Sequence, residues 1–226
     1  MSAMADEERH LRADAERNRR RLLDAAQELF GERGLEVGVG EIAHQAGVGR
    51  GTLFRNFPSK EHLIAAIVAE RMRDASARGR ELLEVPDANQ ALFEFVDEIV
   101  GRQQVDRGLF EAVADTFLAN EEIRDAYTDF VGVLDQLLVR AKQAGAVRED
   151  VGALDVLMML KGVCEAATAF SQVNPTIVGR QLDLVRAAIS VPAASEPLRG
   201  PAPTPDDVAA AFTVDQPAPA RGRGRS

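Results

Sequence analysis

Residues 39–57 read Val39-Gly40-Glu41-Ile42-Ala43-His44-Gln45-Ala46-Gly47-Val48-Gly49-Arg50-Gly51-Thr52-Leu53-Phe54-Arg55-Asn56-Phe57. The spacing predicts two short helices, near 39–45 and 50–57, that meet at an angle through a tight turn containing Gly47. Ala43 is small enough for close helix approach, and the apolar residues Ile42, Val48 and Leu53 are expected to form a small core beneath the turn. This pattern is what a helix-turn-helix requires.

The second helix of such a pair presents its N-terminal residues to the major groove of DNA. Here those residues are Arg50 and Thr52 and, one turn later, Arg55 and Asn56. Arginine can pair bidentately with guanine, and asparagine with adenine. For Arg50 and Arg55, contact with phosphate stays as open as contact with a base. A helix pair that supports the fold without touching DNA is the alternative interpretation.

The flanking sequence predicts a helix on each side of this pair. A first helix is expected over 17–33, with one apolar stripe and a terminating Gly34. Residues 6–16 are highly charged and are expected to be a loose arm or a frayed first turn. Pro58 cannot continue a helix, and Ser59 is expected to cap a fourth one that runs toward Arg80.

Five further helices are predicted after a break at Pro86, and strand signals are absent. They are expected near 88–104, 107–119, 121–144, 152–172 and 176–190. The predicted fold is therefore all-α, with about nine helices.

Residues 153–170 are apolar on nearly every face, so a second subunit is expected to cover them, with 152–172 and 176–190 packing against their symmetry mates as a four-helix bundle. The expected contacts are Val156, Leu160, Val163, Ala167, Leu182, Val185 and Ile189.

The composition divides the chain into three parts. Residues 1–68 are expected to form the helix-turn-helix domain and 69–191 an effector-binding and dimerisation domain. Seven of the ten prolines lie in 192–226, which is expected to be a flexible tail because it holds too little apolar surface to order itself.

Residues 17–68 resemble the DNA-binding domain of the TetR family of transcription regulators. The resemblance rests on Leu29-Phe30 with Gly34, Ile42-Ala43 with Ala46-Gly47-Val48, Gly51-Thr52-Leu53-Phe54, and Phe57-Pro58-Ser59-Lys60-Glu61-His62-Leu63. So many fixed residues at fixed spacing make the match specific, although by motif it covers only about a quarter of the chain.

The resemblance implies that Thr52, Phe54 and Lys60 touch the DNA backbone. Lys60 starts a helix, where the dipole and free N–H groups favour phosphate. The arginines of the first helix are expected on DNA because phosphate would relieve their mutual repulsion; a solvated face is the alternative. The full predicted set is Arg17, Arg20, Arg21, Val39, Arg50, Gly51, Thr52, Phe54, Arg55, Asn56 and Lys60.

The sequence departs from the family pattern at three positions. Gly38 stands where members usually carry a capping Thr or Ser, Gly49 where they often carry Ser, and Phe54 where Tyr is commoner. A glycine cap costs only a few tenths of a kcal/mol, so these changes weaken single contacts without affecting the expected fold.

Apolar side chains of the second domain are candidates for an effector pocket, and the same residues would also suit an ordinary core. Because Met and Phe suit adaptable apolar cavities, the expected effector is small and largely apolar. The candidates are Phe93, Val96, Phe110, Val113, Phe117, Tyr127, Phe130, Leu134, Met158 and Met159.

Charge and composition restrict the remaining classes. The net charge is −9, but residues 1–80 carry 14 Arg and Lys against 13 Asp and Glu, so the excess acid lies in the C-terminal part. The single Cys164 excludes an internal disulfide framework and fits a reducing cytosol. No signal sequence, membrane span, metal-ligand spacing, cofactor motif or catalytic constellation is present, so an enzyme, a metal site and a cofactor are not expected.

The sequence thus predicts a cytoplasmic, ligand-responsive transcription regulator, by default a repressor, that binds a pseudo-palindromic DNA operator as a homodimer. The rival is a ligand-binding or interaction protein of the same fold that no longer binds DNA; Gly38, Gly49, Phe54 and the net acidity favour it. An enzyme is the third possibility.

Overall fold

The computed structural model describes residues 2–113, 120–170, 174, 176–191 and 204, and within these ranges the chain is all-helical apart from turns and one isolated antiparallel bridge, Val147 to Ser190. The helices are α1 (Ser2–Arg33), α2 (Val39–Gln45), α3 (Arg50–Asn56), α4 (Lys60–Leu82), α5 (Ala88–Val113), α6 (Glu121–Gln143), α7 (Ala153–Phe170) and α8 (Ile177–Ile189). The all-α prediction is confirmed.

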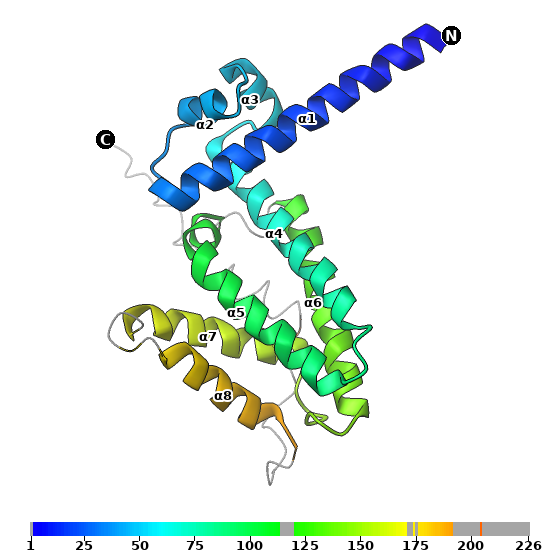
Figure 1. The fold of residues 1–226 in the computed structure, drawn as a ribbon, viewed down its shortest axis with the longest axis vertical. Helices are drawn as coiled ribbons and strands as arrows, with labels where there is room; N and C mark the ends of the chain where they lie inside the picture. The colour runs from blue at the N-terminus through cyan, green and yellow to red at the C-terminus, as the bar shows by residue number, and fades with distance from the viewer. Residues whose placement is uncertain (1, 114–119, 171–173, 175, 192–203, 205–226) are drawn as a thin grey trace, which may run out of the picture.

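The helices form two parts, which we call the head and the body (Figure 1). The head comprises α1–α3 and the first half of α4; the body comprises the rest of α4 with α5–α8. Helix α4 descends from the head and packs against α5 and α6, while α7 and α8 pack together at the far end. The first half of α1 projects well beyond the head.

Each part has its own apolar core, and α4 contributes to both. The head core takes α4 residues as far as Met72, and the body core begins at Ala75. Residues 63–69 of α4 are buried without interruption, as expected of a helix that is covered on every face. The head core also includes Leu109, Ile123 and Ala126 from α5 and α6, so it is completed by body residues.

Local signals explain where these helices begin and end. Gly34 adopts φ 72°, and its N–H donates to the Phe30 carbonyl at 3.0 Å, which ends α1 as predicted. The Ser59 hydroxyl accepts from the His62 N–H at the start of α4. The Asn120 carboxamide oxygen accepts from the Ile123 N–H at 3.1 Å and caps α6.

Two helix boundaries differ from the prediction. Residues 6–16 belong to α1 and are not a loose arm, because alanine, glutamate and arginine extend a helix that the buried part has already nucleated. The break expected between 104 and 107 is absent, and α5 is continuous to Val113, since no proline interrupts it there. Residues 114–119, the end of the second expected helix, lie outside the described residues.

Gly79 lies where α4, α5 and α6 pack closely together. A Cβ built on it would lie 2.9 Å from the Phe95 ring and closer still to Val133. We expect Gly79→Ala to destabilise the protein by about 1–3 kcal/mol, because the added methyl overpacks the junction of α4, α5 and α6. Gly101→Ala is the matched control: it lies in α5 with nothing within 4 Å of its Cβ, and it should be neutral or stabilising by up to about 1 kcal/mol. Urea unfolding measures both; a Gly79→Ala protein as stable as the control would contradict the packing.

Candidate nucleic-acid interface

The predicted helix-turn-helix is present as α2, a turn and α3. Gly47 adopts φ 63° in the turn, and the Val48 N–H donates to the Ala43 carbonyl at 2.9 Å. Ile42 and Leu53 are fully buried beneath it, and Val48 packs against the same core. The expected small core is therefore confirmed, and it fixes the angle at which α3 leaves the turn.

Both helices begin at glycine caps, and at α2 a carboxylate accepts from the N–H of the cap residue itself. The Glu41 carboxylate accepts from the Gly38 N–H at 3.3 Å and pairs with Arg33 at 2.7 Å. The hydrogen bond from Arg33, followed by that from the Gly38 N–H, lowers the pKa of Glu41 below its usual range. Sequence reasoning missed this contact, although an acid three residues after a helix cap is a recognisable capping signal.

The candidate side chains of α3 lie on its exposed side, but some of them already make hydrogen bonds within the helix. Arg55 folds back on its own helix, donating to the Gly51 carbonyl at 3.2 Å and to the Thr52 hydroxyl at 3.1 Å. The Asn56 amide donates to the Thr52 carbonyl at 2.8 Å. Phe54 is 46% exposed, which is high for a large apolar residue. An exposed aromatic ring on this helix is available to a partner.

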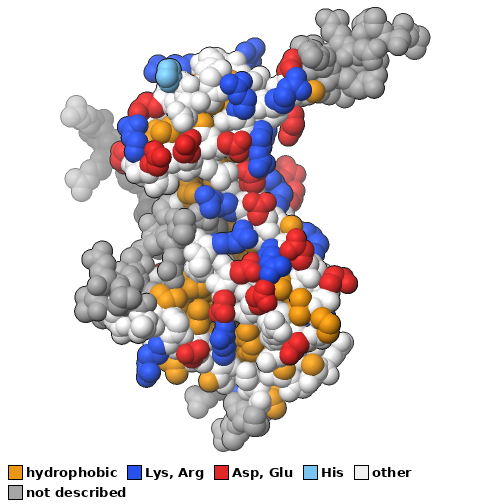
Figure 2. All heavy atoms as spheres, in the orientation of Figure 1, with side chains coloured by type: hydrophobic (Ala, Val, Ile, Leu, Met, Phe, Trp, Pro, Cys, Tyr) orange, Lys and Arg blue, Asp and Glu red, His pale blue; other side chains and the backbone are white. Residues whose placement is uncertain are grey.

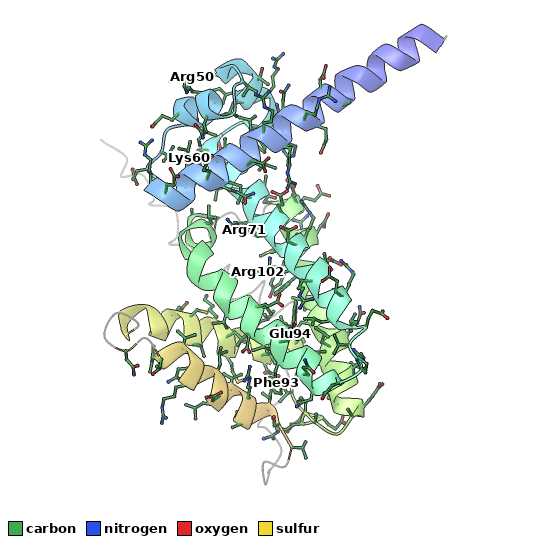
Figure 3. All side chains as sticks on the ribbon, viewed as in Figure 1. Arg50, Lys60, Arg71, Phe93, Glu94 and Arg102 are labelled. Atoms are coloured by element: carbon green, nitrogen blue, oxygen red, sulfur yellow. The ribbon has the colours of Figure 1, made fainter. Side chains whose placement is uncertain are left out.

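Arg50 begins α3 and lies across α2 (Figure 3). A Cβ on Gly40 would come within 2.8 Å of the Arg50 guanidinium carbon, so the absence of a side chain at Gly40 makes room for it. The guanidinium borders a shallow hollow that also includes Arg33, Glu41 and His44. Lys and Arg side chains are visible along the edge of the head formed by these helices (Figure 2).

Lys60 and Val39 are partly buried and already make contacts within the head. The Lys60 ammonium donates to the Leu35 carbonyl and lies 5.8 Å from the Phe30 ring centroid, so it also fixes the loop between α1 and α2. Val39 is half-buried against the head core. Contact of either residue with DNA stays a prediction.

The three arginines expected on DNA from α1 do not form one cluster. Arg17 pairs with Asp14, and Arg20 pairs with Glu70 of α4. Only Arg21 lies at the turn of the helix-turn-helix: a Cβ on Gly47 would come within 2.6 Å of its guanidinium. The structure therefore brings Arg21 to the candidate interface and turns Arg20 toward α4.

Sequence reasoning missed Arg19. Its guanidinium lies 4.6 Å from the ring centroid of Phe57, the residue that ends α3, and 3.2 Å from the Glu122 carboxylate of α6. Arg73 of α4 donates to the same carboxylate. Because Arg19 and Glu122 are 103 residues apart, no local spacing indicates the pair.

The candidate effector residues lie mainly in the body core. Phe93, Val96, Phe130 and Leu134 are buried there, Met159 packs at its edge, and Tyr127 touches both cores. Met158 does not face this interior, because it is 61% exposed. The side chains of Phe110 and Val113, and Phe117 altogether, lie outside the described residues.

The residues expected to meet a second subunit are covered by this chain itself. Six of them are buried within the single chain: Val156, Leu160, Val163, Leu182, Val185 and Ile189. Their burial places them in the core of α7 and α8, and contact of these residues with a second subunit stays a prediction. The side chain of Ala167 lies outside the described part.

Among the described residues, no cluster of His, Cys, Asp and Glu could hold a metal ion. No helix in this part of the chain has the length and hydropathy that crossing a membrane requires. Burial and the neighbouring Glu165 raise the pKa of the Cys164 thiol, which disfavours the reactive thiolate.

The head with its exposed α3 defines a helix-turn-helix DNA-binding protein. Comparison with known proteins agrees: residues 22–67 match the bacterial regulatory proteins of the tetR family, and 87–189 match the SbtR-like C-terminal domain of transcriptional regulators. The HTH-type transcriptional repressor KstR of Rhodococcus jostii is 32% identical over 145 residues, covering 62% of this chain and 67% of that protein.

Solved structures show the same architecture. A TetR transcription regulatory protein from Mycobacterium vanbaalenii superposes with TM-score 0.59 at 34% identity, covering 80% of this chain and 99% of that one. The regulator SCO0520 of Streptomyces coelicolor gives TM-score 0.60 at 28% identity, covering 77% and 99%. The chain belongs to the TetR family of bacterial transcription regulators.

The Glu41 cap predicts a pH dependence of stability. Because folding lowers the pKa of Glu41, its contribution is complete above the ordinary glutamate pKa and is lost as the pH falls through the lowered folded value. We expect wild type to be more stable than Glu41→Gln at neutral pH, and the difference to shrink in acid. Urea unfolding of both proteins across that range measures it. A difference that stays constant with pH would show that the carboxylate charge contributes nothing.

Proposed function

We propose that this protein is a ligand-responsive repressor that binds a pseudo-palindromic DNA operator as a homodimer. The observation that carries the proposal is the exposed face of α3, held at a fixed angle by the buried Ile42 and Leu53. Arg50 and Phe54 are exposed at its first two turns, the part of a recognition helix that enters the major groove. Repression by blocking polymerase is the proposed output, in line with the similarity to the HTH-type transcriptional repressor KstR.

Charge supports a local rather than a general affinity for DNA. Residues 81–226 carry 13 Arg and Lys against 23 Asp and Glu, so this part of the chain repels phosphate and a local basic patch on the head is left to attract it. Affinity should therefore depend on the few arginines near α2 and α3 and should fall steeply with salt.

The dimer is proposed to form through α7 and α8. Among the described side chains of these helices, the large apolar ones that are exposed are Met158 of α7, 61% exposed, and Leu184 of α8, 54% exposed. Burying them against a symmetry mate would give a four-helix bundle. The two α3 helices would then read half-sites about 34 Å apart or wider.

The effector is proposed to be small and largely apolar and to bind among the body helices near Tyr127. This residue packs against both cores, and burial raises the pKa of its phenol, so the hydroxyl stays a hydrogen-bond donor at neutral pH. An effector that prefers one arrangement of the helices would shift the population of head positions through α4.

Selection of binding sites from random duplex DNA, at two salt concentrations, tests the proposal. The full-length protein should enrich a pseudo-palindrome, and Arg50→Glu should lose at least about tenfold in affinity, because phosphate or base contacts are charge-assisted. Lys142→Glu is the matched control, since Lys142 lies at the far end of α6, and it should bind as wild type does.

A folded dimer that enriches no site would overturn the proposal. It would favour instead a ligand-binding protein that kept the fold and lost DNA, for which the glycine caps and the hydroxyl-free Phe54 are the supporting features.

A further inference from the structure

The contact between Arg19 and Glu122 joins the head directly to the body without passing through α4. Arg19 lies on α1, and its Nη2 is 3.2 Å from each oxygen of Glu122 in the first turn of α6. The position of Glu122 at a helix N-terminus favours a carboxylate there. Arg73 of α4 donates to the same carboxylate, so three helices meet at one side chain.

The other side of Arg19 rests on the recognition helix. Its guanidinium carbon is 4.6 Å from the ring centroid of Phe57, which is 1% exposed and follows the last residue of α3. Arginine on an aromatic face is an attractive contact. Arg19 is therefore held between the end of α3 and the start of α6.

A neighbouring contact joins α1 to α4 and does not reach the other body helices. Glu70 of α4 accepts from Arg20 and, at 3.0 Å, from Gln27, but all three residues belong to the head and its adjoining part of α4. Among the ion pairs of the described residues, the Arg19 pair is the one that links α1 to a helix of the body. We call the set Arg19, Phe57, Arg73 and Glu122 the clamp.

We propose that the clamp fixes the angle of the head on the body and thereby sets how strictly the dimer discriminates operator half-site spacing. Arg19 and Glu122 act as positioning residues, and neither needs to touch DNA. The inference rests on the proposed dimeric DNA reading. If the body dimer holds two heads at fixed angles, only one separation of half-sites suits both recognition helices. Loosening the clamp lets each head tilt and accept a neighbouring spacing.

The measured quantity is a ratio of two dissociation constants. One duplex carries the selected operator, and the other carries the same half-sites with the spacer lengthened or shortened by one base pair. Both duplexes present the same half-site contacts. A direct loss of phosphate contact would therefore raise both dissociation constants by the same factor and leave their ratio unchanged.

We expect Glu122→Gln and Arg19→Gln each to reduce this spacing discrimination by about three- to tenfold, since a partly exposed ion pair is lost in each of two heads. The double variant should lose less discrimination than the sum of the two single losses, because both changes remove the shared Arg19–Glu122 contact. Asp129→Asn is the matched control: it breaks the pair between Asp129 of α6 and Arg80 of α4, which involves no residue of α1. Its discrimination should equal that of wild type.

The results distinguish failure of the clamp from failure of the proposed function. If wild type binds one spacing strongly and Glu122→Gln discriminates equally well, the proposed role of the clamp is overturned and the proposed function stays intact. Fully additive losses in the double variant, or an equal loss in Asp129→Asn, also overturn it. Wild type that enriches no operator at all overturns the proposed function itself. Urea unfolding of each variant confirms that it is folded.

Discussion

The structure depends on one constraint: α4 is a single helix that belongs to two cores. Its residues 63–69 are buried in the head, and Leu82, at its other end, is buried in the body. A helix kinks sharply only at an identifiable point such as a proline, and α4 contains no proline. A rearrangement of the body helices around α4 is therefore transmitted to the head, and the contacts of the head with α6 limit how far it can tilt.

Packing around this helix makes the head and the body mutually dependent. Ile123 and Ala126 of α6 complete the head core, and Glu122 beside them binds Arg19 of α1 and Arg73 of α4. Apolar burial supplies most of the stability, whereas these partly exposed charges contribute little energy and chiefly fix orientation. In the proposed dimer, which would present two recognition helices at a defined separation, orientation is the property that matters.

Sequence alone predicted the features that depend on local signals. Gly47, Ile42 and Leu53 specify the turn and its core within a dozen residues, and Gly34, Ser59 and Pro86 mark helix boundaries. Periodicity does not distinguish a residue buried by its own chain from one buried by a partner: Val156 and Leu182 lie in the chain's own core, and their expected contact with a second subunit stays a prediction. The partners Arg19 and Glu122 lie far apart in the chain, and no spacing rule connects them. The helix at the charged start of α1 is not predicted from composition, because composition does not show that an adjoining helix has already nucleated and can be extended.

The central claim, that head and body move as one unit, is tested most directly by the distance between the two heads of a dimer. A spin label placed on exposed α2 as His44→Cys, in a Cys164→Ala background, allows pulsed electron resonance to measure that distance in the full-length protein without DNA. The account predicts narrow distance peaks, since each head is held by α4 and by contacts with α6. A single broad distribution would show heads that swing freely on the body and would contradict it.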